Sequence, residues 1–268
     1  MSISIKRMLK IVASENYDKT NIFYYILIGT VSTIIYGFFM KPSEDILQMV
    51  MSAGIGIILL MVASIWTAGI IVKASHNAIK RKKGVFPNPF KEIGSLFLNG
   101  LIFNVGISIN TTIITLITAI IMIPLIFINP WLSLIAVIPC LYMTFILLGL
   151  HFNYLTTLKI EDWFKYKDAI NFMKAGRGYF GAFFFKSLAL ILIYIVVLLT
   201  ILALAMLLLA GLTLLSGGTK EQSLYSLSQS LGAIIGAVPT GILVVYLTEL
   251  TAQFIRGVLK NQGKIKST

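Results

Sequence analysis

Long runs of apolar residues, separated by short polar segments, set the hydrophobic pattern of this chain. Each of six runs approaches or exceeds the roughly 20 residues that a helix needs to cross a bilayer. The predicted fold class is therefore all-α and polytopic, a bundle of six transmembrane helices in a single membrane domain over residues 21–256. We predict the spans at residues 21–40, 46–72, 97–128, 131–151, 183–215 and 231–254.

Compact connections join the six spans into three hairpins. Residues 41–45 and 129–131 form tight turns, and residues 216–229 form a polar loop. The apolar runs over 93–128 and 183–215 are longer than one crossing requires. We expect these two helices to tilt, to project beyond the hydrocarbon or to begin with an interfacial segment.

Composition supports a membrane protein and excludes several other classes. Hydrophobic residues make up 57% of the 268 residues, and charged residues make up 12%, about half of the roughly 25% that is typical of soluble domains. These values exclude a soluble globular domain and a disordered chain. The single cysteine, Cys140, excludes an intrachain disulfide.

Lysine and arginine are distributed very unevenly between the two sides of the predicted spans. Of the 22 lysine and arginine residues, only Lys41 and Lys220 fall in the short hairpin connections. Positive residues collect on the cytoplasmic side of membrane proteins. We therefore predict a cytoplasmic polar tail at 1–20, a cytoplasmic basic tail at 257–268, and a location in the inner membrane of a prokaryote.

An amphipathic segment lies between the second and third predicted hairpins. Over residues 159–175, apolar side chains fall on one arc of a helical wheel and most charged side chains fall on the opposite arc. We predict one interfacial amphipathic helix there, which Trp163 and Phe164 anchor at the headgroup level of the membrane.

Four consecutive cations, Lys80, Arg81, Lys82 and Lys83, stand in the connection after the first hairpin. No nucleic-acid recognition module accompanies them, so we expect no nucleic-acid partner. One interpretation is that they bind anionic lipids of the inner leaflet or an acidic partner protein. The other interpretation is that they serve only to orient the chain in the membrane.

Four short stretches carry a resemblance to known proteins, at residues 86–90, 94–100, 164–173 and 178–180. They resemble an uncharacterised family of prokaryotic multi-pass membrane proteins that is catalogued as a domain of unknown function. The resemblance covers about residues 45–260 and implies a six-span fold, but it supplies no catalytic residues. That family typically has an acidic, tryptophan-bearing stretch after the proline-containing turn, where this chain has Asn88, Lys91 and Glu92.

Known catalytic motifs do not occur in a usable context. Residues 215–222 resemble the signature loop of ATP-binding-cassette ATPases, but no glycine-rich phosphate loop accompanies them, and the charge pattern places them outside the cell. The sequence contains neither the His-Glu-x-x-His nor the Gly-x-Ser-x-Gly motif. We predict no enzymatic activity, no cofactor and no metal site.

Glu249 is the only acidic residue inside a predicted span. A carboxylate in hydrocarbon is costly unless it is paired, hydrated or protonated. One hypothesis is that Glu249 reaches the inner interface or forms a pair with Lys73, Lys186 or His76. The alternative is that Glu249, Thr248 and Gln253 line a polar pocket for a cation, a proton or a substrate.

Small residues recur at four-residue spacing in the sixth predicted span, where Gly232, Gly236 and Gly241 occur together with Ala233 and Ala237. Such residues let helices approach closely in lipid. We predict that they pack against another helix, with the second span as a neighbour. The alternative is a hinge at Pro239.

Two function classes are compatible with these features. The first is a non-enzymatic membrane component, such as an accessory, regulatory or peptide-immunity protein, which docks a partner on its basic cytoplasmic face. The second is a small permease with a polar route past Glu249. We favour the first class, because transporters usually carry more than one intramembrane ionisable group or paired broken helices.

Overall fold

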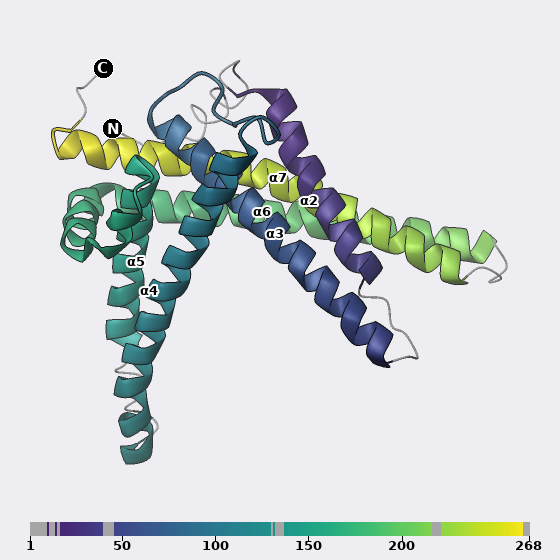
Figure 1. The fold of residues 1–268 in the computed structure, drawn as a ribbon, viewed down its shortest axis with the longest axis horizontal. Helices are drawn as coiled ribbons and strands as arrows, with labels where there is room; N and C mark the ends of the chain where they lie inside the picture. Colours follow the sequence, from purple (N-terminus) through teal and green to yellow (C-terminus); the bar gives the residue numbers. More distant parts are fainter. Residues whose placement is uncertain are drawn as a thin grey trace.

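The computed structural model describes residues 10, 14, 17–39, 46–129, 131, 137–215 and 221–264, with the backbone alone for 36–38, 49, 208–215 and 221–235. Over these residues the chain is helical and contains no β-strand. The elements, shown in Figure 1, are α2 (Lys19–Phe39), α3 (Ile46–Ile79), α4 (Ile93–Ile128), α5 (Val137–Thr157), the 3-10 turn η2 (Ile160–Phe164), α6 (Tyr166–Leu215) and α7 (Glu221–Asn261).

The all-α prediction is confirmed for this part of the chain. Five helices are long and apolar enough to cross a membrane, namely α3, α4, α5, α6 over Tyr166–Leu207 and α7 over Gly236–Asn261. The first predicted span coincides with α2, a helix of 21 residues that is not among those five. The count of six spans therefore stays a prediction.

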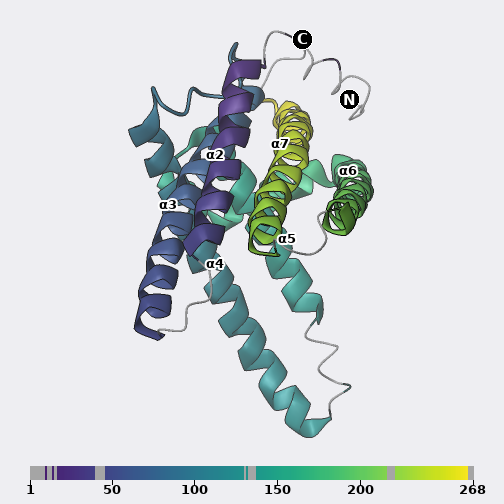
Figure 2. The ribbon, with the colours of Figure 1, turned by 90° about the vertical axis from the view of Figure 1, so that its right-hand side faces the viewer.

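The helices diverge from one end of the molecule. Helix α6 packs against α7 and α5, α3 packs against α4, and α2 packs against both α3 and α7. Figures 1 and 2 show that helices α4 and α5 extend in one direction and helices α6 and α7 in another. The arrangement in three hairpins stays a prediction.

Most of the buried core lies at the end of the molecule where the helices meet. We call this region the base and define it as Tyr17 and residues 70–86, 146–173 and 245–258, which supply most of the fully buried apolar side chains. Helix α6 has 50 residues and is therefore about 75 Å long at about 1.5 Å per residue. A hydrocarbon layer of about 30 Å would cover less than half of that length.

The segment predicted to be an interfacial helix is instead divided between η2 and the first turns of the continuous helix α6. Trp163 does not anchor the surface, because its side chain is 0% exposed, whereas Phe164 is exposed. The indole ring fills a slot against Gly106 of α4, where an added Cβ atom would lie 2.5 Å from the ring. Asn110 of α4 donates to the Trp163 carbonyl oxygen over 3.3 Å and completes the attachment.

The three glycines of the sixth predicted span have different environments. A Cβ atom added to Gly241 would lie 2.3 Å from Ile26 Cγ1, so this residue allows a close contact, and its partner is α2. A Cβ atom added to Gly236 would meet nothing within 4 Å. The surroundings of Gly232 lie outside the described side chains. Helices α3 and α7 do pack together, as predicted.

Candidate functional site

Glu249 of α7 is buried in the base and accepts hydrogen bonds on both carboxylate oxygens. Its side chain is 2% exposed. Oε1 accepts from Arg256 Nη2 at 2.7 Å and from Gln253 Nε2 at 3.3 Å. Oε2 accepts from the Tyr17 hydroxyl at 2.7 Å. Gln253 and Arg256 lie four and seven residues after Glu249, a spacing that brings all three to one face of a helix.

Tyr17 reaches Glu249 because the chain is held firmly where α2 begins. Asp18 is the N-cap residue, since its Oδ1 accepts from the backbone N–H groups of Thr20 at 2.9 Å and Asn21 at 3.4 Å. The preceding Tyr17 side chain is thereby directed into the base, where it is 1% exposed. Burial, followed by the adjacent Glu249 carboxylate, raises the pKa of Tyr17 well above its ordinary value. The phenol therefore stays protonated and donates to Glu249.

Arg256 links this cluster to a second helix. Its Nη1 donates to the backbone carbonyl of Ala78 near the end of α3. A cation near the C-terminus of a helix is favourable because the last carbonyl groups carry partial negative charge. We call Tyr17, Glu249, Gln253 and Arg256 the Glu249 cluster. It connects the segment before α2, the end of α3 and the end of α7.

The partners of Glu249 differ from those proposed from the sequence. Lys73 pairs with Glu92 at 3.3 Å, and His76 Nδ1 lies 2.9 Å from the Leu155 carbonyl oxygen. Arg256 forms the ion pair with Glu249 instead, although the predicted membrane domain ended at this residue. The seven-residue spacing between Glu249 and Arg256, which places both on one face of a helix, is the sequence feature that could have identified the pair. Nothing in the sequence indicated Tyr17, which is distant along the chain.

Of the other two candidate residues, Gln253 joins the cluster and Thr248 does not. The Thr248 hydroxyl is buried and has no hydrogen-bond partner among the described residues. Because three protein side chains already donate to the carboxylate, the cluster has the character of a buried ion pair that fastens helices together. The described part of the chain contains no group of three or more His, Cys, Asp or Glu side chains that is suited to a metal ion.

The basic run 80–83 follows the end of α3 in a well-defined turn. The backbone N–H of Lys82 donates to Asn77 O at 3.0 Å, and that of Arg81 donates to Ala78 O at 3.2 Å. With Arg81 at φ 53°, these bonds form a Schellman motif, which terminates the helix. All four side chains are exposed. The turn therefore presents the cations from a fixed backbone.

The segment after this turn is anchored in the base. Asn77 Nδ2 donates to Val85 O at 3.1 Å, and Asn21 Nδ2 donates to Phe86 O at 2.9 Å. The Phe86 ring is buried next to Tyr17, with the ring centroids 6.2 Å apart. The basic turn is consequently attached to the same core as the Glu249 cluster.

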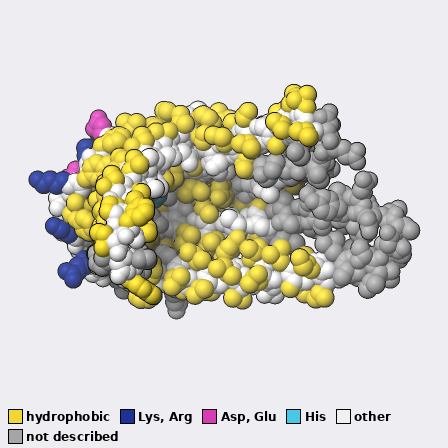
Figure 3. Space-filling model, turned by 90° about the horizontal axis from the view of Figure 1, so that it is seen from below, with side chains coloured by type: hydrophobic (Ala, Val, Ile, Leu, Met, Phe, Trp, Pro, Cys, Tyr) yellow, Lys and Arg dark blue, Asp and Glu magenta, His cyan; other side chains and the backbone are white. Residues whose placement is uncertain are grey.

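Charge is concentrated at one end of the molecule. Figure 3 shows lysine and arginine side chains at the end that lies away from the α6–α7 turn, while the rest of the visible described surface is largely apolar. Several acidic side chains in or near the base are already paired within the chain. Glu92 pairs with Lys73, and Glu161 and Asp162 pair with Lys165.

Comparison with known proteins identifies no relative. No family model matches the chain, and neither the curated proteins nor the solved structures contain a significant match. The resemblance to a six-span membrane family therefore stays a hypothesis.

Proposed function

We propose that this protein is a non-enzymatic component of a prokaryotic inner membrane that docks a partner on its basic cytoplasmic face. Its role would be accessory, regulatory or protective against a peptide. Both termini would be cytoplasmic, as the distribution of lysine and arginine indicates. Partners of matching chemistry are an acidic protein surface and the anionic lipids of the inner leaflet.

One observation carries this proposal. Lys80, Lys82 and Lys83 are exposed on a fixed turn and form no ion pair with any described residue, whereas Glu92, Glu161 and Asp162 are paired internally. A cluster of exposed cations on a rigid support favours association with a negatively charged partner.

A site-specific crosslinking experiment in cells tests the proposal. A photoreactive amino acid is placed at position 82, and a matched one is placed at position 264 in the C-terminal basic segment. We expect a discrete protein or lipid adduct at position 82 that disappears when Lys80 and Lys83 are changed to Gln. Equal labelling at both positions would indicate non-specific attraction by charge and would contradict the proposal. Reporter fusions at 82 and at the C-terminus check that both lie in the cytoplasm.

A small permease with a polar route past Glu249 is the second candidate. The unpaired Thr248 hydroxyl beside the cluster favours it. The saturation of Glu249 by Tyr17, Gln253 and Arg256 disfavours it, because a coupling carboxylate must be able to exchange its partner for a proton or a cation. Solute uptake by vesicles that is lost in Glu249→Gln at unchanged protein abundance would support the permease.

A further inference from the structure

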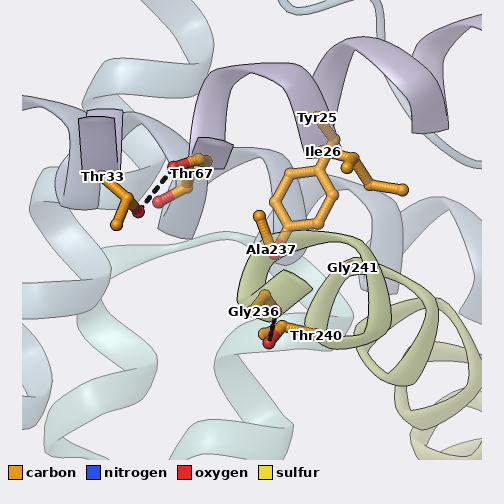
Figure 4. Close-up of a pocket in the computed structure, with 9 residues that line it drawn as sticks. Tyr25, Ile26, Thr33, Thr67, Gly236, Ala237, Thr240 and Gly241 are labelled. Atoms are coloured by element: carbon orange, nitrogen blue, oxygen red, sulfur yellow. Dashed lines mark hydrogen bonds between the residues drawn. The ribbon is translucent and has the colours of Figure 1, made fainter. Parts of the chain in front are cut away.

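A cavity of about 290 Å³ lies between α2, α3 and α7, away from both the Glu249 cluster and the basic turn. Figure 4 shows its lining residues on the three helices that surround it. The lining residues are Tyr25, Ile26, Gly29, Thr33, Thr67, Gly236, Ala237, Thr240 and Gly241.

Two glycines keep this space open. Helices α2 and α7 are in tight contact at Ile26 and Gly241, but a Cβ atom added to Gly29 or to Gly236 would meet nothing within 4 Å. The missing side chains of Gly29 and Gly236 therefore leave the cavity unfilled. A larger side chain at either position would project into open space rather than into a neighbouring helix.

The cavity carries an unpaired hydrogen-bond donor. Tyr25 is 8% exposed, and its hydroxyl has no hydrogen-bond partner among the described residues. In Figure 4 its ring extends from α2 towards Ala237 of α7. The hydroxyl is free to donate to a molecule in the cavity, so a ligand that accepts this hydrogen bond is favoured over one that cannot.

Hydroxyl oxygens from three helices complete the polar lining. Thr33 donates to Gly29 O, Thr67 donates to Ala63 O, and Thr240 donates to Gly236 O. Because these protons are used within the helices, the oxygens of Thr33 and Thr67 remain available as acceptors. The Thr240 oxygen lies 2.9 Å from the Tyr194 hydroxyl, so it keeps one acceptor position rather than two. The nine lining residues carry no formal charge. An ion would therefore find no counter-charge there, and a hydrocarbon chain would leave the Tyr25 hydroxyl unpaired.

We propose that this cavity binds a small neutral polyol group that accepts a hydrogen bond from Tyr25 and donates to the threonine oxygens. Two sources supply this chemistry, namely a free polyol such as glycerol or xylitol, and the glycerol moiety of a neutral lipid that enters from the membrane. The binding site is independent of partner docking on the basic face.

The experiment uses the full-length protein purified in detergent. Binding of radiolabelled glycerol and xylitol is measured by scintillation proximity, and co-purified neutral glycerolipid is measured by native mass spectrometry. Tyr25→Phe removes the donor, and Gly29→Leu fills the cavity. Tyr24→Phe is the matched control, because Tyr24 packs against Phe90 with centroids 5.3 Å apart and does not line the cavity.

We expect one saturable polyol site or one retained glycerolipid in the wild type and in Tyr24→Phe. Affinity or lipid occupancy should fall at least tenfold in Tyr25→Phe and should be abolished in Gly29→Leu. Polyol binding without retained lipid identifies the free polyol as the ligand. Retained glycerolipid without polyol binding identifies the lipid as the ligand. Absence of both from the wild type, or the same values in all variants, overturns the proposal. If Tyr25→Phe does not fold, Gly29→Leu alone decides, since its side chain has open space.

Discussion

Glu249 and Arg256 lie two turns apart on α7 and form a buried ion pair with an N–O distance of 2.7 Å. The guanidinium group also binds the end of α3 through Ala78, and the carboxylate also binds Tyr17 before α2. One ion pair thus joins α7 to the end of α3 and to the segment before α2 at the base. It fixes the relative positions of helices that diverge elsewhere.

Breaking this pair from one side should be strongly destabilising. Glu249→Ala leaves the Arg256 charge buried without its partner, and we expect a loss of about 3–5 kcal/mol in the free energy of unfolding. Thermal unfolding of the purified protein in detergent measures the change. Glu161→Gln is the matched control, because Glu161 is a largely exposed partner of Lys165 and should contribute less than about 1 kcal/mol. Equal losses in the two variants would contradict a structural role for Glu249.

Tyr17 should make stability depend on alkaline pH. Because its pKa is raised in the folded state, the folded protein favours the neutral phenol. Its contribution is complete below the ordinary tyrosine pKa of about 10 and decreases as the pH rises above that value. Tyr17→Phe should be less stable than the wild type at pH 7. The difference in the free energy of unfolding between the two proteins should become smaller above about pH 10.

Absorbance provides a direct check on the same residue. The tyrosinate absorbance of wild type and Tyr17→Phe should rise equally between about pH 9 and pH 11, since Tyr17 does not ionise while the protein is folded. One additional tyrosinate in the wild type over that pH interval would show that Tyr17 ionises in the folded protein, and it would contradict the prediction.

Helices α3 and α4 cross with their backbones in contact at Gly69 and Gly100. A Cβ atom added to Gly69 would lie 1.7 Å from the Leu96 carbonyl oxygen, and one added to Gly100 would lie 1.8 Å from the Ile65 carbonyl oxygen. Since backbone cannot move aside as a side chain can, Gly69→Ala should cost about 3 kcal/mol or more. Gly94→Ala in the first turn of α4 is the control, because its methyl group meets no atom within 4 Å. The yield of monodisperse protein after gel filtration should fall for the first variant only.

Gly84 and Gly178 should respond to alanine with opposite signs. Both have open space for a methyl group, but Gly84 has φ 69°, whereas Gly178 lies within α6. Gly84→Ala should cost about 1–2 kcal/mol, because it strains the turn that returns Val85 and Phe86 to the base. Gly178→Ala should stabilise the protein by roughly 0.5–1 kcal/mol through helix propensity. A shift of both melting temperatures in the same direction would exclude backbone conformation as the cause.

Much of the architecture could be predicted from hydrophobic run length, because a helix satisfies its own backbone hydrogen bonds in lipid. The runs at 46–72 and 183–215 fall within α3 and α6, and α6 begins at Tyr166, well before the second of these runs. The polar connection at 73–92 was also recognisable, although α3 continues to Ile79 before it ends. These features depend on short-range pattern, which a single sequence contains.

The environment of individual side chains was decided by tertiary structure alone. A helical wheel shows that Trp163 belongs to an apolar face, but it does not distinguish a lipid surface from a slot beside Gly106, some 57 positions earlier in the chain. The same limit applies to Tyr17 and Glu249, which are separated by 232 positions and meet only after the helices assemble. The sequence by itself therefore determined which segments are helical and apolar and where the cations stand. Tertiary packing determined which polar groups pair and where a cavity remains, because those outcomes depend on contacts between distant segments.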